Sequence, residues 1–543
     1  MTAIAPNTTI WLLNTRLNYN SEDTFYFESL SQQTSYFDSL KILSFTNYTY
    51  QREQRQYIKV GVNGSDMAIA IKTCNYLMWK NSSYENKNYY AFITEVEWIN
   101  NEVVKMYFEM DYIQTYMFNF NIRQCFIIRQ HSETDRIGEN ILPEPVELGE
   151  YVINGGNTKC IPEGESSNDQ ACIVVVEVDS SQSTGRLTDG VYSAVKLHVY
   201  DISGTGVQLA QNLINSQTVA GHPENILAIY ATKYYLLGLS PDVSTDRVLS
   251  SSQQPFKRSI NVPDITENDE IDGYTPKNKK LFTYPYTFCN VTNCKGGDIN
   301  LRYEWWNRIE GESYCQLKMY NTRSMPVTIQ IRPYSYKGET YSESDSNGVS
   351  TDIFVELSGQ PLGSFAVDNF TAWLAQNQAN LIGTAFSIAS TGVVGGVMAE
   401  ANPMAAVTAT SSIVDSIVNT GVQAYNASIA ADRFSGTISG SAVQYNNELD
   451  GLYYRRMSVN RQYARSIDDF FTMYGYTQNK LATPNIHART RYTYVRTLGF
   501  NCVANIPQDA RAFINKRFDN GIRFWVDKEN TFCDYSTPNL PLT

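Results

Sequence analysis

Each of the four histidines in this 543-residue chain stands alone in its part of the sequence: His131, His198, His222 and His487. Zinc sites usually draw on histidines and cysteines a few residues apart, and no C-x-x-C pair occurs here. The phosphate-binding loop G-x-x-x-x-G-K-[ST], the hydrolase motif G-x-S-x-G and the protease motif H-E-x-x-H are also absent from the sequence. We therefore predict no metal site, no cofactor and no catalytic residue.

Carboxylates are the remaining candidates for chemistry, because the acid–base pair of a glycosidase can come from distant parts of a chain. Glu95 and Glu97 lie on the polar face of one expected strand, and Glu109 and Asp111 lie on its neighbour. A face that meets solvent or another subunit is the commoner meaning of such a pattern. A polysaccharide-degrading enzyme is therefore the weaker interpretation.

The nine cysteines are scattered, and no basic segment precedes an apolar core near residue 1. Reduced thiols in a cytoplasm are the default expectation for this pattern. Cys289 and Cys294 flank an expected turn, so a disulfide within a hairpin is the minor alternative.

The formal net charge of −12 argues against tight non-specific binding to nucleic acid, because phosphates would be repelled. A local basic cluster could still contact DNA, but pairing with carboxylates of a neighbouring subunit is favoured in an acidic protein. Its members are Arg455, Arg456, Arg461 and Arg465. A content of 13% aromatic and 18% charged residues suits either large subunit interfaces or a β-rich protein.

The carboxylates at 95–111 are positioned by the clearest hairpin of the sequence, with strands at 90–99 and 103–112. An Asn-Asn pair forms the expected turn. Apolar residues alternate along both strands and predict one buried face on each. These residues are Phe92, Val96 and Trp98 in the first strand and Val104, Met106, Phe108 and Met110 in the second.

Other elements are expected from shorter patterns. Alternation at 58–62 and again at 67–71 predicts two strands near the N-terminus. After a proline-containing boundary at 141–151, strands at 171–178 and 194–202 and a helix at 208–216 predict a small inserted α/β domain. Further strands are expected at 281–291, 300–307, 315–320, 327–333 and 352–357.

A long apolar segment interrupts this polar chain. Residues 369–399 contain no Asp, Glu, Lys or Arg, and residues 400–431 contain only Glu400 and Asp415. Such a segment is buried in protein or enters lipid, because exposed it would be an aggregation patch.

The segment divides into two limbs. Residues 381–398 have about the shortest length that spans a bilayer core, roughly 17 to 25 residues. Residues 405–431 could supply a return limb, and Asn402-Pro403 predicts a turn between the two, so a helical hairpin is the simplest shape.

Two environments remain open for this hairpin. Frequent Ser and Thr and the lack of flanking Lys or Arg argue against a permanent membrane anchor. A segment that is hidden first and inserted later explains these features, and a hairpin packed permanently in a core is the alternative. Protonation of Glu400 and Asp415 would lower the cost of insertion, so we predict that acid favours it.

Several blocks along the chain, in matching order, resemble the distal tail tube, or tail knob, protein of small podophages of the Bacillus picovirus type. They cover about half of the chain, and the apolar segment lies where that family carries one. The blocks are residues 89–98, 107–118 and 126–131, then 284–286 with 296–301, and finally 463–465, 470–476, 484–485, 489–495 and 518–525.

The resemblance implies a mostly β protein with some α structure (α+β), a subunit of a ring-shaped hexameric tube with a long apolar insertion. In that family, apolar loops plug the tube and later form a pore through which DNA enters the cytoplasm. The membrane-inserting residues would be Leu381, Ile382, Phe386, Ile388, Val393, Val394, Val397, Met398, Met404, Val407, Ile413, Val414, Ile417 and Val418, with Glu400 and Asp415 as a protonation switch.

The expected partners are five further copies of the chain, the upper tail tube or connector protein, and the host cytoplasmic membrane. DNA would pass the acidic lumen without sequence-specific binding. The expected location is the virion tail tip, after assembly in the host cytoplasm.

This interpretation divides the chain into five parts. The tube domain would comprise residues 1–140, 281–360 and 441–543, with an inserted outer domain at 141–280 and the hydrophobic loop at 361–440. A tail or connector subunit with a permanently buried hairpin, and a wall-degrading tail-tip enzyme, are the alternatives.

Overall fold

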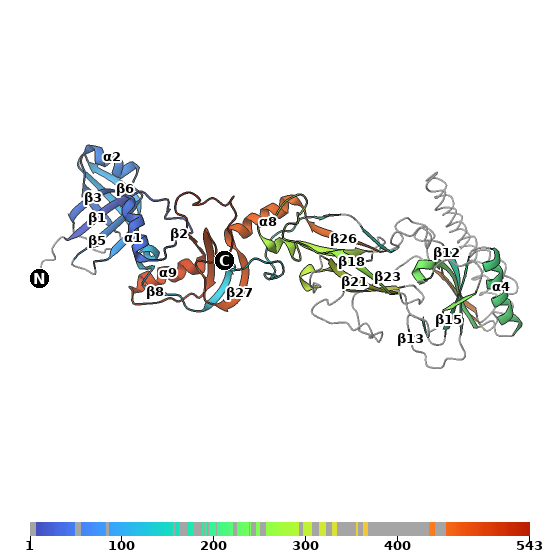
Figure 1. The fold of residues 1–543 in the computed structure, drawn as a ribbon. Coiled ribbons are helices and arrows are strands. Elements are labelled where there is room, and N and C mark those ends of the chain that lie inside the picture. Colours follow the sequence, from blue (N-terminus) through green and yellow to red (C-terminus); the bar gives the residue numbers. More distant parts are fainter. Residues whose placement is uncertain are drawn as a thin grey trace. The chain divides into compact units, whose positions relative to one another are not determined.

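A computed structural model describes most of the chain, which forms a mostly β fold with some helices (Figure 1). The described residues are 7–48, 56–82, 86–155, 158–161, 171–178, 187–188, 191–192, 195–201, 204–220, 225–237, 239, 246–249, 257–292, 297–306, 314–321, 328–333, 354–356, 362–367, 434–439 and 452–542.

The chain divides into two compact units that are each built from separated pieces of sequence. Unit 1 comprises Met1–Gly149, Gly273–Phe282 and Asn460–Thr543, and unit 2 comprises Glu150–Asp272 and Thr283–Val459.

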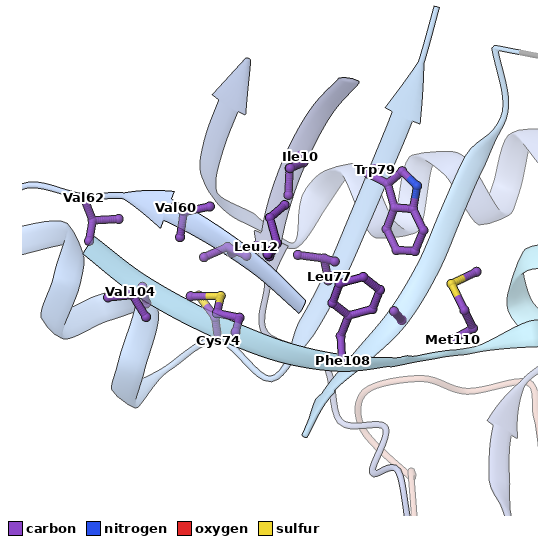
Figure 2. Packing of buried hydrophobic residues seen from close by; sticks show 14 residues of the cluster. Ile10, Leu12, Val60, Val62, Cys74, Leu77, Trp79, Val104, Phe108 and Met110 are labelled. Atoms are coloured by element: carbon purple, nitrogen blue, oxygen red, sulfur yellow. The ribbon is translucent and has the colours of Figure 1, made fainter. Parts of the chain in front are cut away.

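An antiparallel six-stranded sheet forms the N-terminal part of unit 1. In spatial order its strands are β3 (Lys41–Tyr48), β1 (Thr8–Leu13), β5 (Tyr76–Asn81), β6 (Asn88–Asn100), β7 (Val103–Met110) and β4 (Tyr57–Gly61). The two edge strands contribute to the same core, since Phe45 of β3 and Val60 of β4 belong to one cluster. The backbone N–H of Gly61 also donates to the Tyr48 hydroxyl over 3.2 Å. The sheet therefore curls around its core (Figure 2).

The predicted hairpin of β6 and β7 is confirmed. Its second strand has the expected buried face, formed by Val104, Met106, Phe108 and Met110. In the core, the rings of Phe108 and Trp79 lie with their centroids 5.5 Å apart (Figure 2).

The first strand does not keep one face along its length. Phe92 packs in a cluster with Tyr76 and Tyr90, whereas Val96 packs in the core of the curled sheet. The pairing register shifts between Ile93 and Glu95, and an extra residue at such a β-bulge moves the following side chains to the other face. The prediction that Phe92 and Val96 share a face was therefore wrong.

The strand predicted at 67–71 was wrong, because this stretch belongs to helix α2 (Gly64–Lys72). Asp66 lies in its first turn and Lys72 in its last, where each charge complements the helix dipole. Ala70 is buried against the curled sheet.

A mixed five-stranded sheet forms the second part of unit 1 and joins distant pieces of sequence. In spatial order its strands are β2 (Asp23–Phe25), β30 (Ile522–Trp525), β28 (Tyr492–Leu498), β9 (Cys125–Gln130) and β27 (Tyr476–Ala482). The only parallel pair among these strands is β2 with β30. Near the sheet, β8 (Phe120–Asn121) pairs with β29 (Val503–Ala504).

Besides α2, the described residues of unit 1 contain the helices α1 (Leu30–Ser39), α3 (Tyr112–Tyr116), α8 (Arg461–Tyr474) and α9 (Gln508–Asn520). Helix α8 begins at Asn460, whose side chain accepts from the Tyr463 N–H, and ends at Gly475. Gly475 has a φ of 65°, and a Cβ there would lie 2.4 Å from the carbonyl group of Gln130. Only glycine therefore allows β27 to start so close to β9.

One aromatic cluster unites the two parts of unit 1. It contains Tyr76 and Tyr90 from the curled sheet, Phe37 from α1, and Tyr492 and Trp525 from the five-stranded sheet. All five side chains are almost fully buried. The first and last parts of the chain therefore share one core.

Unit 2 contains two smaller sheets that are entirely antiparallel. The first holds β10 (Tyr151–Ile153), β26 (Leu452–Val459), β19 (Thr287–Thr292) and β20 (Asp298–Leu301), with β11 (Thr158–Ile161) also on β26. The second holds β18 (Lys257–Pro263), β21 (Tyr314–Asn321), β22 (Thr328–Pro333) and β23 (Phe354–Glu356). Short 3₁₀ turns are η3 (Lys279–Phe282), in unit 1, and η4 (Tyr303–Trp305), in unit 2.

The third sheet of unit 2 contains the predicted strands near 171–178 and 194–202, and both are confirmed. Its order is β17 (Arg247–Leu249), β15 (Val195–Asp201), β12 (Ala171–Val178), β16 (Ile226–Lys233), β24 (Leu362–Val367) and β25 (Phe434–Ser439). The predicted helix is α4 (Gly204–Val219), which lies against this sheet (Figure 1). Nearby are η2 (Tyr234–Leu237) and the small pair β13 (Leu187–Thr188) and β14 (Val191–Tyr192).

Substitution of Phe108 by Ala should lower the free energy of unfolding by about 3–5 kcal/mol, because the ring is 3% exposed and its removal leaves a cavity. Chemical denaturation of the purified chain measures this change. The matched control is Trp98→Ala in the same hairpin. Trp98 is 64% exposed, so its loss should change stability by less than about 0.5 kcal/mol. Equal losses for the two variants would contradict the packing.

Candidate functional site

The residues predicted to enter a membrane lie outside the described residues, and so do Glu400 and Asp415. The strands on either side show how the apolar segment is attached. β24 and β25 pair in antiparallel register from Leu362↔Ser439 to Val367↔Phe434. The segment therefore leaves the third sheet of unit 2 and rejoins it at directly adjacent positions.

The rest of that sheet anchors the strand pair. β24 pairs with β16, and β16 pairs along its length with β12. Cys172, Val174 and Val176 of β12 are buried in one cluster with Leu197 and Val199 of β15. The apolar segment is thus attached to a sheet with a core of its own.

No helix in the described ranges is both long and apolar enough to span a bilayer. Within the same residues, no group of three or more His, Cys, Asp or Glu side chains is arranged to hold a metal ion. Cys289 is buried, and its candidate disulfide partner Cys294 lies outside the described residues.

Three of the four carboxylates considered for catalysis, Asp111, Glu109 and Glu97, have separate structural partners. Asp111 caps α3 by accepting from the Gln114 N–H over 3.0 Å, and burial raises the pKa of its carboxyl group. Glu109 accepts a hydrogen bond from the Tyr19 hydroxyl. Glu97 pairs with Lys105 over 3.4 Å. These contacts explain three of the four candidates as parts of the fold.

The arginine cluster is also divided. Arg456 forms an ion pair with Asp269 of the same chain over 2.7 Å and donates to the Asp264 carbonyl over 3.0 Å. Arg456 is therefore paired with a carboxylate of its own chain. The Arg465 guanidinium lies 5.7 Å from the ring centre of Tyr274.

Unit 1 contains a buried ionic group, centred on Glu144, that no sequence motif indicates. Its side chain is fully buried, forms ion pairs with Arg129 and with Lys280, the latter over 2.6 Å, and accepts from Thr477. Burial lowers the pKa of Lys280, and Glu144 opposes that effect. The group joins the segment before unit 2, the segment 273–282 and strand β27.

A second buried carboxylate, Asp468 of α8, holds the same segment 273–282. Asp468 accepts from the Tyr274 hydroxyl over 2.7 Å, the Lys277 N–H over 2.8 Å and the Asn278 N–H over 3.0 Å. Two segments that lead to and from unit 2 are therefore fixed to unit 1 by side chains that water does not reach.

His131 is also buried in unit 1, and both of its ring nitrogens make hydrogen bonds. Nδ1 accepts from the Tyr494 N–H over 2.8 Å, and Nε2 lies 3.1 Å from the Thr472 carbonyl, to which it donates. Burial, assisted by nearby Arg489, lowers the pKa of His131 to about 3. The ring is therefore neutral and structural.

The sequence carries one signal of this group, within the boundary predicted at 141–151. Glu144 lies between Pro143 and Pro145, and prolines restrict the backbone around it to extended conformations. Two of its partners, Lys280 and Thr477, are more than 100 residues away in sequence, so no local pattern could reveal the whole group.

Comparison with known proteins identifies the family. Residues 254–540 match the family described as the C-terminal domain of the tail knob protein gp9 of Bacillus phage phi29. The chain belongs to this family. Residues 6–121 match a second family, the N-terminus of caudoviral major tail proteins.

Relatives along the full length agree with this assignment. The tail knob protein gp9 of Bacillus phage B103 is 24% identical over 94% of this chain and 95% of its own length. The corresponding protein of Bacillus phage PZA is 25% identical over 93% and 94%, and that of phi29 is 24% identical over 95% and 96%. The tail knob protein gp12 of bacteriophage C1 has the same fold, with a TM-score of 0.58 and 13% identity over 98% of this chain and 100% of its own.

The predicted family is therefore confirmed, and the chain is a structural component of the phage tail within the virion. These relatives are named as tail components and not as enzymes. The catalytic alternative is thereby set aside.

Substitution of Glu144 by Gln should destabilise unit 1 by about 3–5 kcal/mol, because Arg129 and Lys280 would keep their buried charges without a counter-charge. Glu147→Gln is the matched control, since Glu147 is exposed in the same segment. Urea unfolding of the two variants measures the difference. Two equal and small effects would show that the ionic group contributes little.

Because His131 is buried in its neutral form, we predict that the folded chain loses stability in acid. The unfolded chain binds a proton at His131 below a pH of about 6.5, whereas the folded chain binds it only near 3. Stability from this residue is therefore complete above about 6.5 and decreases as the pH falls toward 3, by up to roughly 1.4 kcal/mol per pH unit.

The variant His131→Asn isolates this contribution. It should be less stable than the natural chain at neutral pH, because it loses a hydrogen bond and packing, yet lose less stability on acidification. Unfolding free energies at neutral and acidic pH provide the comparison. An identical acid dependence in both chains would contradict the neutral, buried ring.

Proposed function

We propose that six copies of the chain form a tube at the distal end of a short, non-contractile phage tail. The apolar segment between β24 and β25 plugs this tube before infection. It is then released and forms a pore in the host cytoplasmic membrane through which the genome passes.

The pairing of Val367 with Phe434 is the observation that supports this proposal most directly. Because both ends of the segment are fixed at neighbouring positions, the segment can change its surroundings while the sheet that holds it stays intact. Between those ends, residues 369–431 carry only two charges, Glu400 and Asp415. Few charges have to be neutralised when such a segment enters lipid.

The other proposed partners follow from the same arrangement. Six copies would contribute twelve limbs, enough to line a pore that one hairpin could not form. A net charge of −12 per chain would keep DNA from adhering to the lumen. The upper end of the tube would join the upper tail tube or connector protein.

Replacement of residues 369–432 by a short Asn-Gly linker tests the proposal. The linker closes β24 and β25 into a tight hairpin, so the sheet should be retained. Particles should then assemble and adsorb but fail to deliver DNA, measured as genome entry into cells. DNA delivery at the natural level would refute the pore. Failure to assemble would instead favour the alternative of a permanently buried, structural hairpin.

Dye release from liposomes by the intact protein tests the membrane step separately. Leakage should be greater at about pH 5 than at about pH 8, because protonation of Glu400 and Asp415 removes their charge. Val394→Asp should reduce leakage at both pH values, since it adds a charge to the apolar segment. Val394→Leu is the matched control and should leak like the natural chain.

A further inference from the structure

His198 lies between two carboxylates in the sheet that carries the apolar segment. Its Nδ1 lies 3.1 and 3.2 Å from the two carboxylate oxygens of Asp246, and its Nε2 lies 2.8 Å from Oε2 of Glu177. The His198 side chain is 8% exposed. Only the charged imidazolium has an N–H on each nitrogen and can donate to both carboxylates at once.

The contacts of His198 continue into helix α4. The second oxygen of Glu177 accepts from the Gln217 amide, and Oε1 of Gln217 accepts from the Asn225 amide over 3.0 Å. One chain of hydrogen bonds therefore links the residue before β17, the strands β15 and β12, helix α4 and the residue before β16.

The other charged and titratable groups around His198 define its electrostatic balance. Lys196 of β15 is directly opposite Glu177 of β12 in the strand ladder. Tyr200 lies two residues beyond His198 on β15; burial, and then Asp246, raise the pKa of its phenol, so it remains neutral. Arg247 directly follows Asp246 at the start of β17. A charged His198 places a positive charge between the two carboxylates, and a neutral His198 does not.

We propose that His198 is a proton-dependent clasp, closed when its imidazole is charged, which holds α4 and the edge strand β17 on the sheet. This clasp is a property of the folded domain and does not depend on what the apolar segment does.

The direction of the effect follows from hydrogen-bond chemistry. A neutral imidazole donates from one nitrogen only, so the lone pair of the other would face a carboxylate about 3 Å away and repel it. Imidazole is the side chain whose charge changes between about pH 5 and pH 8. Loss of the second ring proton of His198 as the pH rises should therefore loosen the clasp.

Hydrogen–deuterium exchange of the intact protein at about pH 6 and about pH 8, corrected for the intrinsic rate, tests the clasp. Amides of α4 and β17 should exchange about tenfold faster or more at the higher pH, because a charge-assisted hydrogen bond is lost. His198→Gln should show the fast exchange at both pH values. The control His487→Gln, which removes a histidine of unit 1, should keep the natural response.

Asp246→Asn gives the decisive contrast, and it remains informative if His198→Gln does not fold. The amide of Asn can donate to the bare nitrogen of a neutral His198, so the clasp should stay closed at about pH 8. Exchange of α4 at that pH should then fall to the level seen at about pH 6. Equal exchange at the two pH values in the natural chain, or an undiminished pH difference in Asp246→Asn, would overturn the proposal.

Discussion

The parallel pairing of β2 with β30 is the constraint on which the arrangement of the chain depends. Residues near 24 and near 524 lie side by side in this pair, and the buried side chains of Tyr492 and Trp525 pack with those of Tyr76 and Tyr90. Neither end of the chain can complete its core without the other. Residues 150–459, apart from 273–282, form unit 2 and are therefore inserted into a core that the two ends of the chain build together.

The same principle recurs on a smaller scale in unit 2. The segment between β24 and β25 is an insertion in a sheet, and these two paired strands hold the two ends of the segment. Closing a long loop costs entropy that grows only slowly with its length, so a paired strand at each end suffices to tolerate a long insertion. A tail protein can thus carry an apolar segment without building its core from it.

Buried charges lie near the places where the chain passes between unit 1 and unit 2. The Glu144 and Asp468 groups fix segments that adjoin unit 2, and each satisfies its carboxylate with several donors from sequence-distant residues. Unpaired, such charges would be costly, so any displacement of the segments from unit 1 is opposed strongly. An apolar contact of similar size would fix the segments less precisely, because apolar surfaces can slide past one another.

The sequence predicted local features well and long-range features poorly. The hairpin of β6 and β7, the strands near 171–178 and 194–202 and the helix near 208–216 were evident, because their periodicity extends over many residues. The alternation at 67–71 was too short to distinguish a strand from α2, and a single bulge separated Phe92 from Val96. The family emerged from ordered blocks, whereas the Glu144 and His198 groups depend on partners that no local spacing reveals.

Acid should have opposite effects on the apolar segment and on the sheet that carries it: it should ease movement of the segment and strengthen the His198 contacts. Protonation would neutralise Glu400 and Asp415 in the apolar segment and so reduce the cost of moving it into lipid. In the proposed clasp, the same change would charge His198 and strengthen its hydrogen bonds to Asp246 and Glu177, which hold α4 and β17 on the sheet. Under the proposed function, a fall in pH would therefore ease entry of the segment into lipid while α4 and β17 are held more firmly on the sheet that carries it.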